Sequence, residues 1–189
     1  MSHPLDQLCH DLAAEFQKDP KGKRVADLLG RYAEENGDWR DWTFFETERY
    51  TRNLVHRCGD FELLLLCWDH DQSSPIHDHD GQQCWMAVLD GTVEEVHYRE
   101  KDGQLVEGAV RRFQRGQVAF IQDEIALHLV RAGAGGRGVS LHLYSNPIDA
   151  CRIYEEGTGE SRWIEVGYHS VRGELCGEKT AETVRAEWA

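Results

Sequence analysis

The chain has 189 residues and a formal net charge of −13 at pH 7. This length allows one sizeable core but is short for two, so we expect a single domain over residues 1–189. An acidic surface repels the phosphates of nucleic acids and anionic lipids, and the Lys and Arg residues do not cluster. We therefore expect neither nucleic acid nor a membrane as a partner.

The cysteines and the N-terminal sequence indicate the cell compartment. Six cysteines are scattered without any CxxC pair, which argues against a disulfide framework and against a structural zinc site. The start, MSHPLDQLCHDLAAEF, lacks a signal peptide pattern, and no run approaches the ~20 apolar residues of a membrane span. We expect a cytoplasmic protein and, without a heptad pattern or an obvious apolar exposed strand, a monomer.

The N-terminal part of the chain has helical periodicity. Between residues 4 and 36, apolar residues recur at helical spacing, which predicts two amphipathic helices divided near Asp19-Pro20. These helices form a predicted prefix over residues 1–40, to which we assign a packing role.

From Tyr50 onward the periodicity changes to that of strands. The predicted strands are YTRNLVH, FELLLLCW, CWMAVLD, TVEEVHY, AVRRF, QVAFI, HLVRA, VSLHLYS and RWIEVGY. Asp90-Gly91 predicts a hairpin between two of them. Many short strands after a helical prefix predict a mainly β fold, with a closed sandwich or barrel over residues 45–170 and a tail over residues 171–189.

Three histidines are candidate metal ligands. His77 and His79 are two residues apart, so on a strand both imidazoles project from the same face. His128 lies within the apolar run of residues 125–130, where a neutral imidazole needs a buried partner. A metal ion is one such partner, and a hydrogen bond in the core is the other.

The spacing around these histidines resembles a known motif. After His79, four residues precede Cys84 and six more precede Gly91, which resembles the first cupin motif with cysteine in its acidic position. Within cupins, cysteine at that position is typical of the cysteine dioxygenases. Three further segments agree with that family: residues 50–55 (YTRNLV), residues 73–79, and residues 140–145 (SLHLYS) followed by Pro147. The chain therefore resembles the cysteine dioxygenase type I family from about Tyr50 to Cys151.

The resemblance implies a fold, a cofactor and a reaction. It implies a cupin-type small β-barrel, or jelly roll, with one iron(II) ion per chain held by His77, His79 and His128. Its substrates would be L-cysteine and O2, and its product would be cysteine sulfinic acid. Three histidines by themselves would also suit zinc, copper or nickel.

The resemblance also assigns a substrate-binding residue. It places Arg52 at the substrate carboxylate, and the planar fork of a guanidinium matches both carboxylate oxygens. Tyr50 lies two residues before Arg52 and shares its strand face, so its hydroxyl is expected in the same pocket.

A second group of residues is expected around the metal ligands. Ser140, His142 and Tyr144 alternate along VSLHLYS and so share one strand face. With that face inward, His142 can hydrogen-bond both hydroxyls and orient Tyr144. In the family, the cysteine at the position of Cys84 and the tyrosine at that of Tyr144 become joined by a thioether, so we expect this cross-link. His97 and Cys151 are given no role beyond packing.

Several alternatives stay open. The nearest is a dioxygenase for another small thiol such as 3-mercaptopropionate, although that group typically has glutamine where this chain has Arg52. A second is a metal-binding cupin without redox chemistry, such as an isomerase or a sensor, which would not need Arg52, Cys84 and Tyr144 together. A purely structural β-barrel would leave the buried histidines unexplained.

Overall fold

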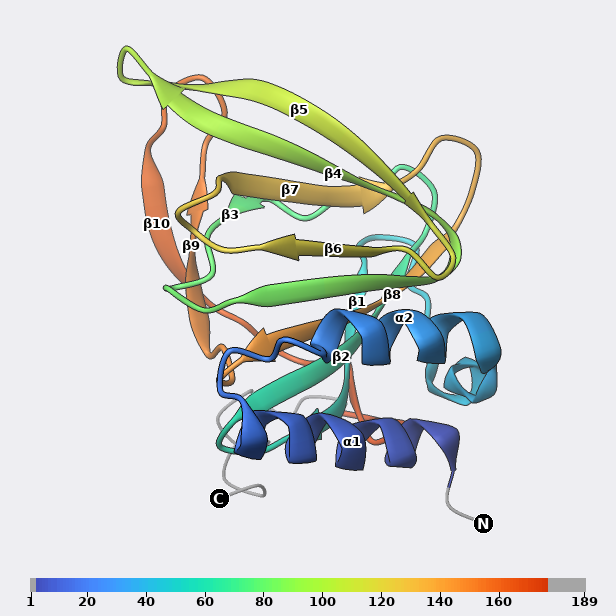
Figure 1. Cartoon of the computed structure of the whole chain (residues 1–189). Helices are drawn as coiled ribbons and strands as arrows, with labels where there is room; N and C mark the ends of the chain where they lie inside the picture. Colours follow the sequence, from blue (N-terminus) through green and yellow to red (C-terminus); the bar gives the residue numbers. More distant parts are fainter. Residues whose placement is uncertain (1–2, 177–189) are drawn as a thin grey trace.

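The computed structural model describes residues 3–176, in which two α-helices and a short 3-10 helix precede a curved sheet (Figure 1). The helices are α1 (Pro4–Lys18), α2 (Val25–Glu35) and the short 3-10 helix η1 (Asp38–Trp42). The strands are β1 (Thr51–Arg57), β2 (Phe61–Trp68), β3 (Ile76–His77), β4 (Cys84–Lys101), β5 (Gln104–Gln114), β6 (Val118–Ile121), β7 (Leu127–Ala132), β8 (Gly138–Ser145), β9 (Ala150–Tyr154), β10 (Ser161–Glu165), β11 (Ser170–Val171) and β12 (Glu174–Leu175). The predicted mainly β fold with two N-terminal helices is confirmed. Most of the predicted tail, residues 177–189, lies outside the described residues.

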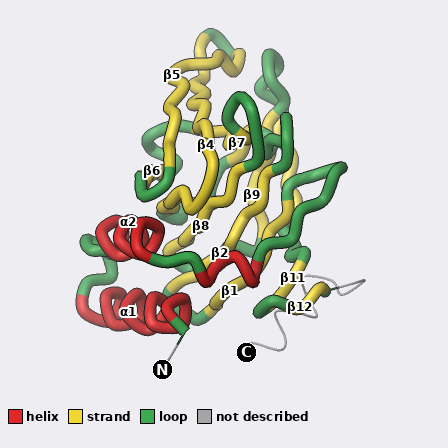
Figure 2. The backbone as a smooth tube through the Cα atoms, turned by 90° about the vertical axis from the view of Figure 1, so that its right-hand side faces the viewer, coloured by secondary structure: helices red, strands yellow, loops and turns green. Residues whose placement is uncertain are grey.

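The two helices cover one face of the sheet (Figure 2). α1 begins at Pro4, whose fixed φ suits the first helical position and whose missing N–H is not needed there. Leu12 of α1 and Leu29 of α2 are fully buried, and burying a leucine side chain stabilises a fold by about 1.5–3 kcal/mol. Within residues 3–176, neither helix has the length and apolar character needed to cross a bilayer.

The strands form one sheet whose hydrogen bonding remains open. Its order is β10-β9-β3-β7-β4-β8-β2-β1-β11-β12, with β5 and β6 each paired to β4. Instead of pairing with β10, β1 pairs in parallel with the short strand β11, so the hairpin of β11 and β12 occupies that edge. Within residues 3–176, the expectation of a closed barrel is therefore corrected to a curved sheet whose end strands, β10 and β12, do not pair with each other.

The hairpin predicted at Asp90-Gly91 is wrong, because β4 continues through both residues as one strand. The register between β4 and β8 shifts between Val88 and Asp90, and Gly91 has a φ of 67°. A Cβ atom at Gly91 would lie 2.1 Å from the carbonyl oxygen of Arg137. Glycine thus permits a close backbone approach and a bulge that bends the strand. The bend lets the first half of β4 pair with β6 and β8, and the second half with β5 and β7.

Alternation along β8 separates the two faces of the sheet. Leu141 and Leu143 pack with the helices in one core cluster. Ser140, His142 and Tyr144 are buried on the opposite face, which is the concave interior. The predicted polar face is therefore inward, and the candidate site lies on that side.

Candidate active site

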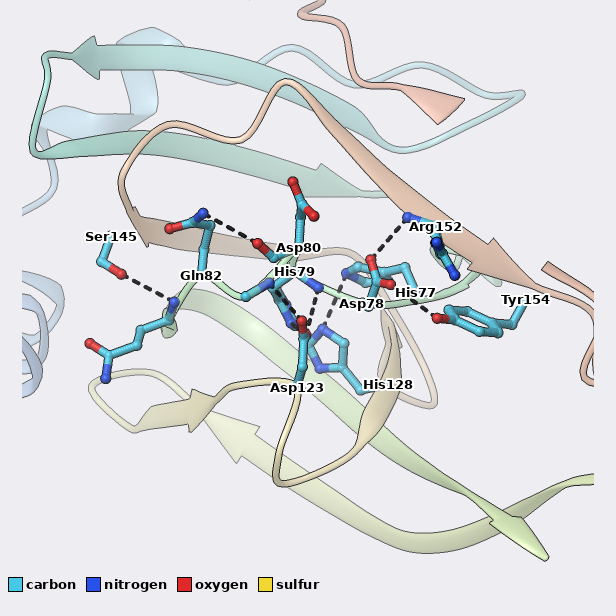
Figure 3. Close-up of polar contacts among 12 residues, drawn as sticks. His77, Asp78, His79, Asp80, Gln82, Asp123, His128, Ser145, Arg152 and Tyr154 are labelled. Atoms are coloured by element: carbon cyan, nitrogen blue, oxygen red, sulfur yellow. Dashed lines mark hydrogen bonds and ion pairs between the residues drawn. The ribbon is translucent and has the colours of Figure 1, made fainter. Parts of the chain in front are cut away.

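Three histidines converge inside the curved sheet (Figure 3). His77 ends β3 and stands directly opposite His128 of β7, while His79 follows two residues after His77. One ring nitrogen from each histidine lies within 4.8 Å of the corresponding nitrogens of the other two, and the Nε2 atoms of His77 and His128 are 3.2 Å apart. Two nitrogen atoms that each bind the same metal ion at about 2.1 Å can be this far apart. The geometry therefore suits one metal ion.

The other ring nitrogen of two of these histidines faces an oxygen atom. His77 Nδ1 lies 3.0 Å from the carbonyl oxygen of Pro75, and His128 Nδ1 lies 2.9 Å from Glu95 Oε1. A carbonyl or carboxylate oxygen only accepts hydrogen bonds, so each imidazole carries its hydrogen on Nδ1. That tautomer leaves the Nε2 lone pair available to a metal ion.

His79 is fully buried, and neither of its ring nitrogens has a hydrogen-bond partner among residues 3–176. An unpaired buried polar group costs about 1–3 kcal/mol. Asp123 stands beside it: Oδ1 accepts a 2.7 Å hydrogen bond from the His79 backbone N–H and lies 3.4 Å from His79 Nδ1. Its Oδ2 accepts a hydrogen bond from the Gly81 N–H. A metal at Nε2, with Asp123 beside Nδ1, would give His79 its partners, so the residues present fit a metal ion.

Burial keeps two of these imidazoles uncharged. It lowers the pKa of His77 to about 3, with a further contribution from the nearby His79. It also lowers the pKa of His128 well below the usual value, and the neighbouring His77 and His79 act in the same direction. The neutral imidazole is the form that binds a metal ion, so the site is ready for one at neutral pH.

Asp78, between the two ligands of the HxH pair, points away from the other histidines, as period two predicts (Figure 3). Its carboxylate accepts hydrogen bonds from the Arg152 N–H at 2.9 Å and the Tyr154 hydroxyl at 3.0 Å. Because β3 has only two residues, these bonds help to fix His77 and His79 against β9.

Acidic partners of the histidines were missed by the analysis of the sequence. Glu95 is 1% exposed, and its Oε2 lies 3.0 Å from Nε2 of His97, which stands directly opposite His128. His97 was assigned no role, yet it belongs to this buried group. The segment TVEEVHY carried a signal, because period two puts Glu95 and His97 on one face of a buried strand. Asp123 lies in the loop between β6 and β7, where no periodicity could indicate it.

A small cavity of about 40 Å³, the inner cavity, lies beside His77. Its lining residues are Tyr50, Arg52, Pro75, His77, Tyr144, Ile148, Cys151, Ile153, Ile164 and Val166. A larger cavity of about 280 Å³, the outer cavity, shares Tyr50 and Arg52 with it and is lined by residues 49–52 and 164–169. Cys151, expected to be a packing residue, is buried and contributes to the wall of the inner cavity.

Arg52 brings a positive charge to this cavity on a side chain that is 15% exposed. Its Nε donates a 3.2 Å hydrogen bond to the carbonyl oxygen of Gly167, whereas its Nη2 has no hydrogen-bond partner among the described residues. Burial opposes the charged form, but the nearby carboxylate of Glu62 helps to raise the pKa of Arg52 above its usual value. The guanidinium is therefore charged and retains a free donor inside the site.

The polar face of β8 forms a hydrogen-bonded chain. Trp68 Nε1 donates to the Ser140 hydroxyl at 2.9 Å, and the same hydroxyl lies 2.9 Å from His142 Nε2. The rings of His142 and Tyr144 have centroids 6.4 Å apart. The expected hydrogen bond from His142 to Ser140 is present, but the one to the Tyr144 hydroxyl is absent from residues 3–176. Tyr50 stacks on Trp68 with a centroid distance of 4.6 Å. Trp68, which was not predicted, thus connects Ser140 to the cavity wall at Tyr50.

Cys84 and Tyr144 stand directly opposite each other on β4 and β8. Directly opposite residues in an antiparallel pair have Cβ atoms about 4.5–5.5 Å apart. Burial raises the pKa of the Cys84 thiol, and the charge of Glu95 adds to this. Burial also raises the pKa of the Tyr144 phenol, with Cys84 next in effect. Both groups are therefore uncharged at neutral pH.

Comparison with known proteins gives the family. A profile described as "Cysteine dioxygenase type I" matches residues 3–157 of this chain. The chain belongs to the cysteine dioxygenase type I family. It is 34% identical over 177 residues to "Cysteine dioxygenase type 1" of Danio rerio, which covers 90% of this chain and 88% of that protein. The Homo sapiens protein of the same name is 33% identical over 174 residues, covering 89% of this chain and 86% of that protein.

A solved structure supports the fold alone. A protein from Klebsiella pneumoniae with a double-stranded β-helix domain superposes with a TM-score of 0.50 at 12% identity, covering 70% of this chain and 91% of that one. Membership in the cysteine dioxygenase type I family makes the chain an enzyme of a dioxygenase family and explains why its segments match in order. The matched range includes each of the predicted site residues.

Proposed function

We propose that this protein is an iron(II)-dependent dioxygenase that converts L-cysteine and O2 to cysteine sulfinic acid. Both oxygen atoms of O2 add to the sulfur. The thiol sulfur loses four electrons and O2 gains four, so no other reductant is needed.

One observation carries this proposal: Arg52 and His77 line the same small cavity. Arg52 Nη2 has no hydrogen-bond partner among residues 3–176, so it can bind a substrate carboxylate. A thiol attached to that carboxylate through a short carbon chain would lie near the three histidines. The site thus suits a small carboxylic acid that carries a thiol, of which cysteine is the proposed example.

The proposed metal ligands are His77, His79 and His128. When bound there, iron(II) would favour the thiolate form of the substrate and supply the redox chemistry with O2. Glu95 and Asp123 would hold His128 and His79 in position. Two observations support these three residues as the metal ligands. The imidazole of His77 is neutral, and the two ring nitrogens of His79 have no hydrogen-bond partner among residues 3–176.

Other side chains are proposed to shape the substrate pocket. Tyr50 would border the carboxylate bound at Arg52, and Ser140 with His142 would support the wall behind Tyr144. None of these groups needs to act as a base, because coordination to a metal deprotonates a thiol at neutral pH.

We also propose the thioether between Cys84 and Tyr144. The sulfur of Cys84 would bond to the ring carbon ortho to the phenol hydroxyl. The hydrogen of that carbon and the thiol hydrogen would pass with their electrons to O2, which becomes hydrogen peroxide. Their facing positions on β4 and β8 support this step. The bond would fix the phenol beside the site, which improves preorganisation.

The remaining proposals concern assembly and location. We propose a cytoplasmic monomer, in keeping with five free cysteines (Cys9, Cys58, Cys67, Cys84 and Cys151) and a strongly acidic chain. Light scattering after size-exclusion chromatography would measure the mass in solution, and a dimer mass would contradict the monomer.

The reaction is tested by anaerobic loading with iron(II), followed by L-cysteine and air. We expect cysteine sulfinate to form in step with oxygen uptake. An iron-loaded protein that consumes no oxygen with cysteine would contradict the proposed substrate, and 3-mercaptopropionate would then be tested. Inactivity with every small thiol would favour a metal cupin without redox chemistry.

A further inference from the structure

A buried carboxylate stands behind the arginine of the inner cavity. Glu62 of β2 has no exposed surface, and burial raises its pKa. Its Oε2 accepts hydrogen bonds from Arg57 Nη1 and from the Tyr168 hydroxyl, each at 2.5 Å. Its Oε1 has no hydrogen-bond partner among the described residues and lies 3.8 Å from Arg52 Nη2. This network is not part of the metal centre.

A β-bulge creates the network. Between β1 and β2, Leu54 pairs with Leu64 but His56 pairs with Leu63, so Val55 is the extra residue. The bulge moves Arg57 to the concave face, opposite Glu62. Simple alternation along β1 would have placed His56 there and turned Arg57 toward the helices.

Glu62 acts on Arg52 from two sides. Directly, its free oxygen attracts the guanidinium across 3.8 Å at a mostly buried position, where charges are screened less than in water. Indirectly, it holds the Tyr168 hydroxyl, and the carbonyl oxygen of the adjoining residue, Gly167, accepts the hydrogen bond from Arg52 Nε. The next N–H, that of His169, donates to the carbonyl oxygen of Arg52 at 2.7 Å. The segment that anchors Arg52 is therefore itself anchored by Glu62.

We propose that Glu62 is a positioning residue that orients Arg52 for a substrate carboxylate. This inference rests on the proposed function, in which Arg52 binds that carboxylate. Without the negative charge, Arg52 and Arg57 would be two like charges in one buried space, and the guanidinium would turn away from its present position. The effect is selective, because a thiol without a carboxylate makes no use of Arg52.

The test compares L-cysteine with cysteamine, which has the thiol and the amine but no carboxylate. In the iron-loaded enzyme, Glu62→Gln keeps the side-chain volume and removes the charge. We expect the KM for cysteine to rise roughly tenfold relative to that for cysteamine, the scale of one charge-assisted contact. Tyr168→Phe removes only the indirect anchor, so we expect a shift of about threefold in the same ratio.

A matched control is Glu94→Gln. Glu94 also pairs with two arginines, Arg112 and Arg131, but it does not line the inner or outer cavity. We expect this variant to leave the cysteine-to-cysteamine ratio of KM values within twofold of the wild type. If Glu94→Gln changed the cysteine-to-cysteamine ratio of KM values as much as Glu62→Gln does, the proposal would be overturned. Loss of any buried carboxylate would then have the same effect, whether or not it lies near Arg52.

Binding without turnover separates this proposal from the proposed function. Anaerobic titration of the cobalt(II)-loaded protein, followed by visible absorption, gives the Kd of each thiol, and we expect Glu62→Gln to weaken cysteine alone. Equal Kd changes for both thiols, or tighter cysteine binding, would overturn the positioning role. If the wild type binds cysteine no better than cysteamine, and Arg52→Ala changes nothing, the proposed function fails instead. Should Glu62→Gln not fold, Tyr168→Phe carries the same comparison.

Discussion

Glu95→Gln tests whether a buried carboxylate determines the metal affinity of the histidine site. The substitution keeps the volume of a side chain that is 1% exposed and removes the charged acceptor that lies 2.9 Å from His128 Nδ1. A hydrogen bond to a charged group contributes about 1.5–3 kcal/mol, and about 1.4 kcal/mol corresponds to a tenfold change in affinity. We therefore expect metal binding to weaken about 10–100-fold, the range typical of partners that orient a ligand.

The assay is an anaerobic competition titration with a chelator of known affinity, using cobalt(II) and iron(II) in turn. Glu94→Gln is the matched control, because it makes the same chemical change one residue earlier on the same strand, where the side chain pairs with Arg112 and Arg131. A folded Glu95→Gln protein whose metal Kd stays within twofold of the wild type would refute the reasoning. Glu95 would then be a structural residue whose hydrogen bond does not tune His128.

Three further predictions concern substrate, cross-link and acid stability. Arg52→Ala should raise the KM for cysteine at least tenfold and that for cysteamine less than twofold, from the loss of a charge-assisted pair; equal effects in steady-state assays would contradict the carboxylate role. After turnover, intact-mass analysis should find the wild type lighter by about two hydrogens, and Cys84→Ser should lack this change; identical behaviour would remove the thioether. Burial lowers the pKa of His77 to about 3, and it lowers those of His128 and His142 as well. In the unfolded chain these histidines have a pKa of about 6.5, so below that pH they bind protons that the folded protein does not bind. The free energy of unfolding of the metal-free protein should therefore fall as the pH drops below ~6.5, by up to about 1.4 kcal/mol per pH unit for each such histidine. Urea unfolding at several pH values measures this, and a flat profile between pH ~6.5 and ~5 would contradict it.

Local patterns in the sequence predicted a large part of the interior. Period two along VSLHLYS placed Ser140, His142 and Tyr144 on one face, and the structure puts all three on the concave side. The same rule separated His77 and His79 from Asp78. These predictions were possible because the alternation of side chains follows from the covalent geometry of an extended chain. No distant contact is needed to establish it.

Strand pairing and its irregularities were decided only by the tertiary structure. Asp90-Gly91 has the composition of a hairpin, yet close approach to the backbone at Arg137 makes it a bend within β4. The bulge at Val55 reverses the faces that alternation assigns to His56 and Arg57. Both features depend on which strand lies alongside and in which register, and residues far away in the chain determine this.

The sequence by itself determined the helical prefix, the mainly β fold, the family motifs and which residues share a strand face. Only the tertiary structure brought Glu95 beside His128, Asp123 beside His79 and Glu62 behind Arg52. The physical reason is that buried polar groups find their partners across the sheet. Periodicity along one strand says which way a side chain points, but the packing of several strands decides what it meets.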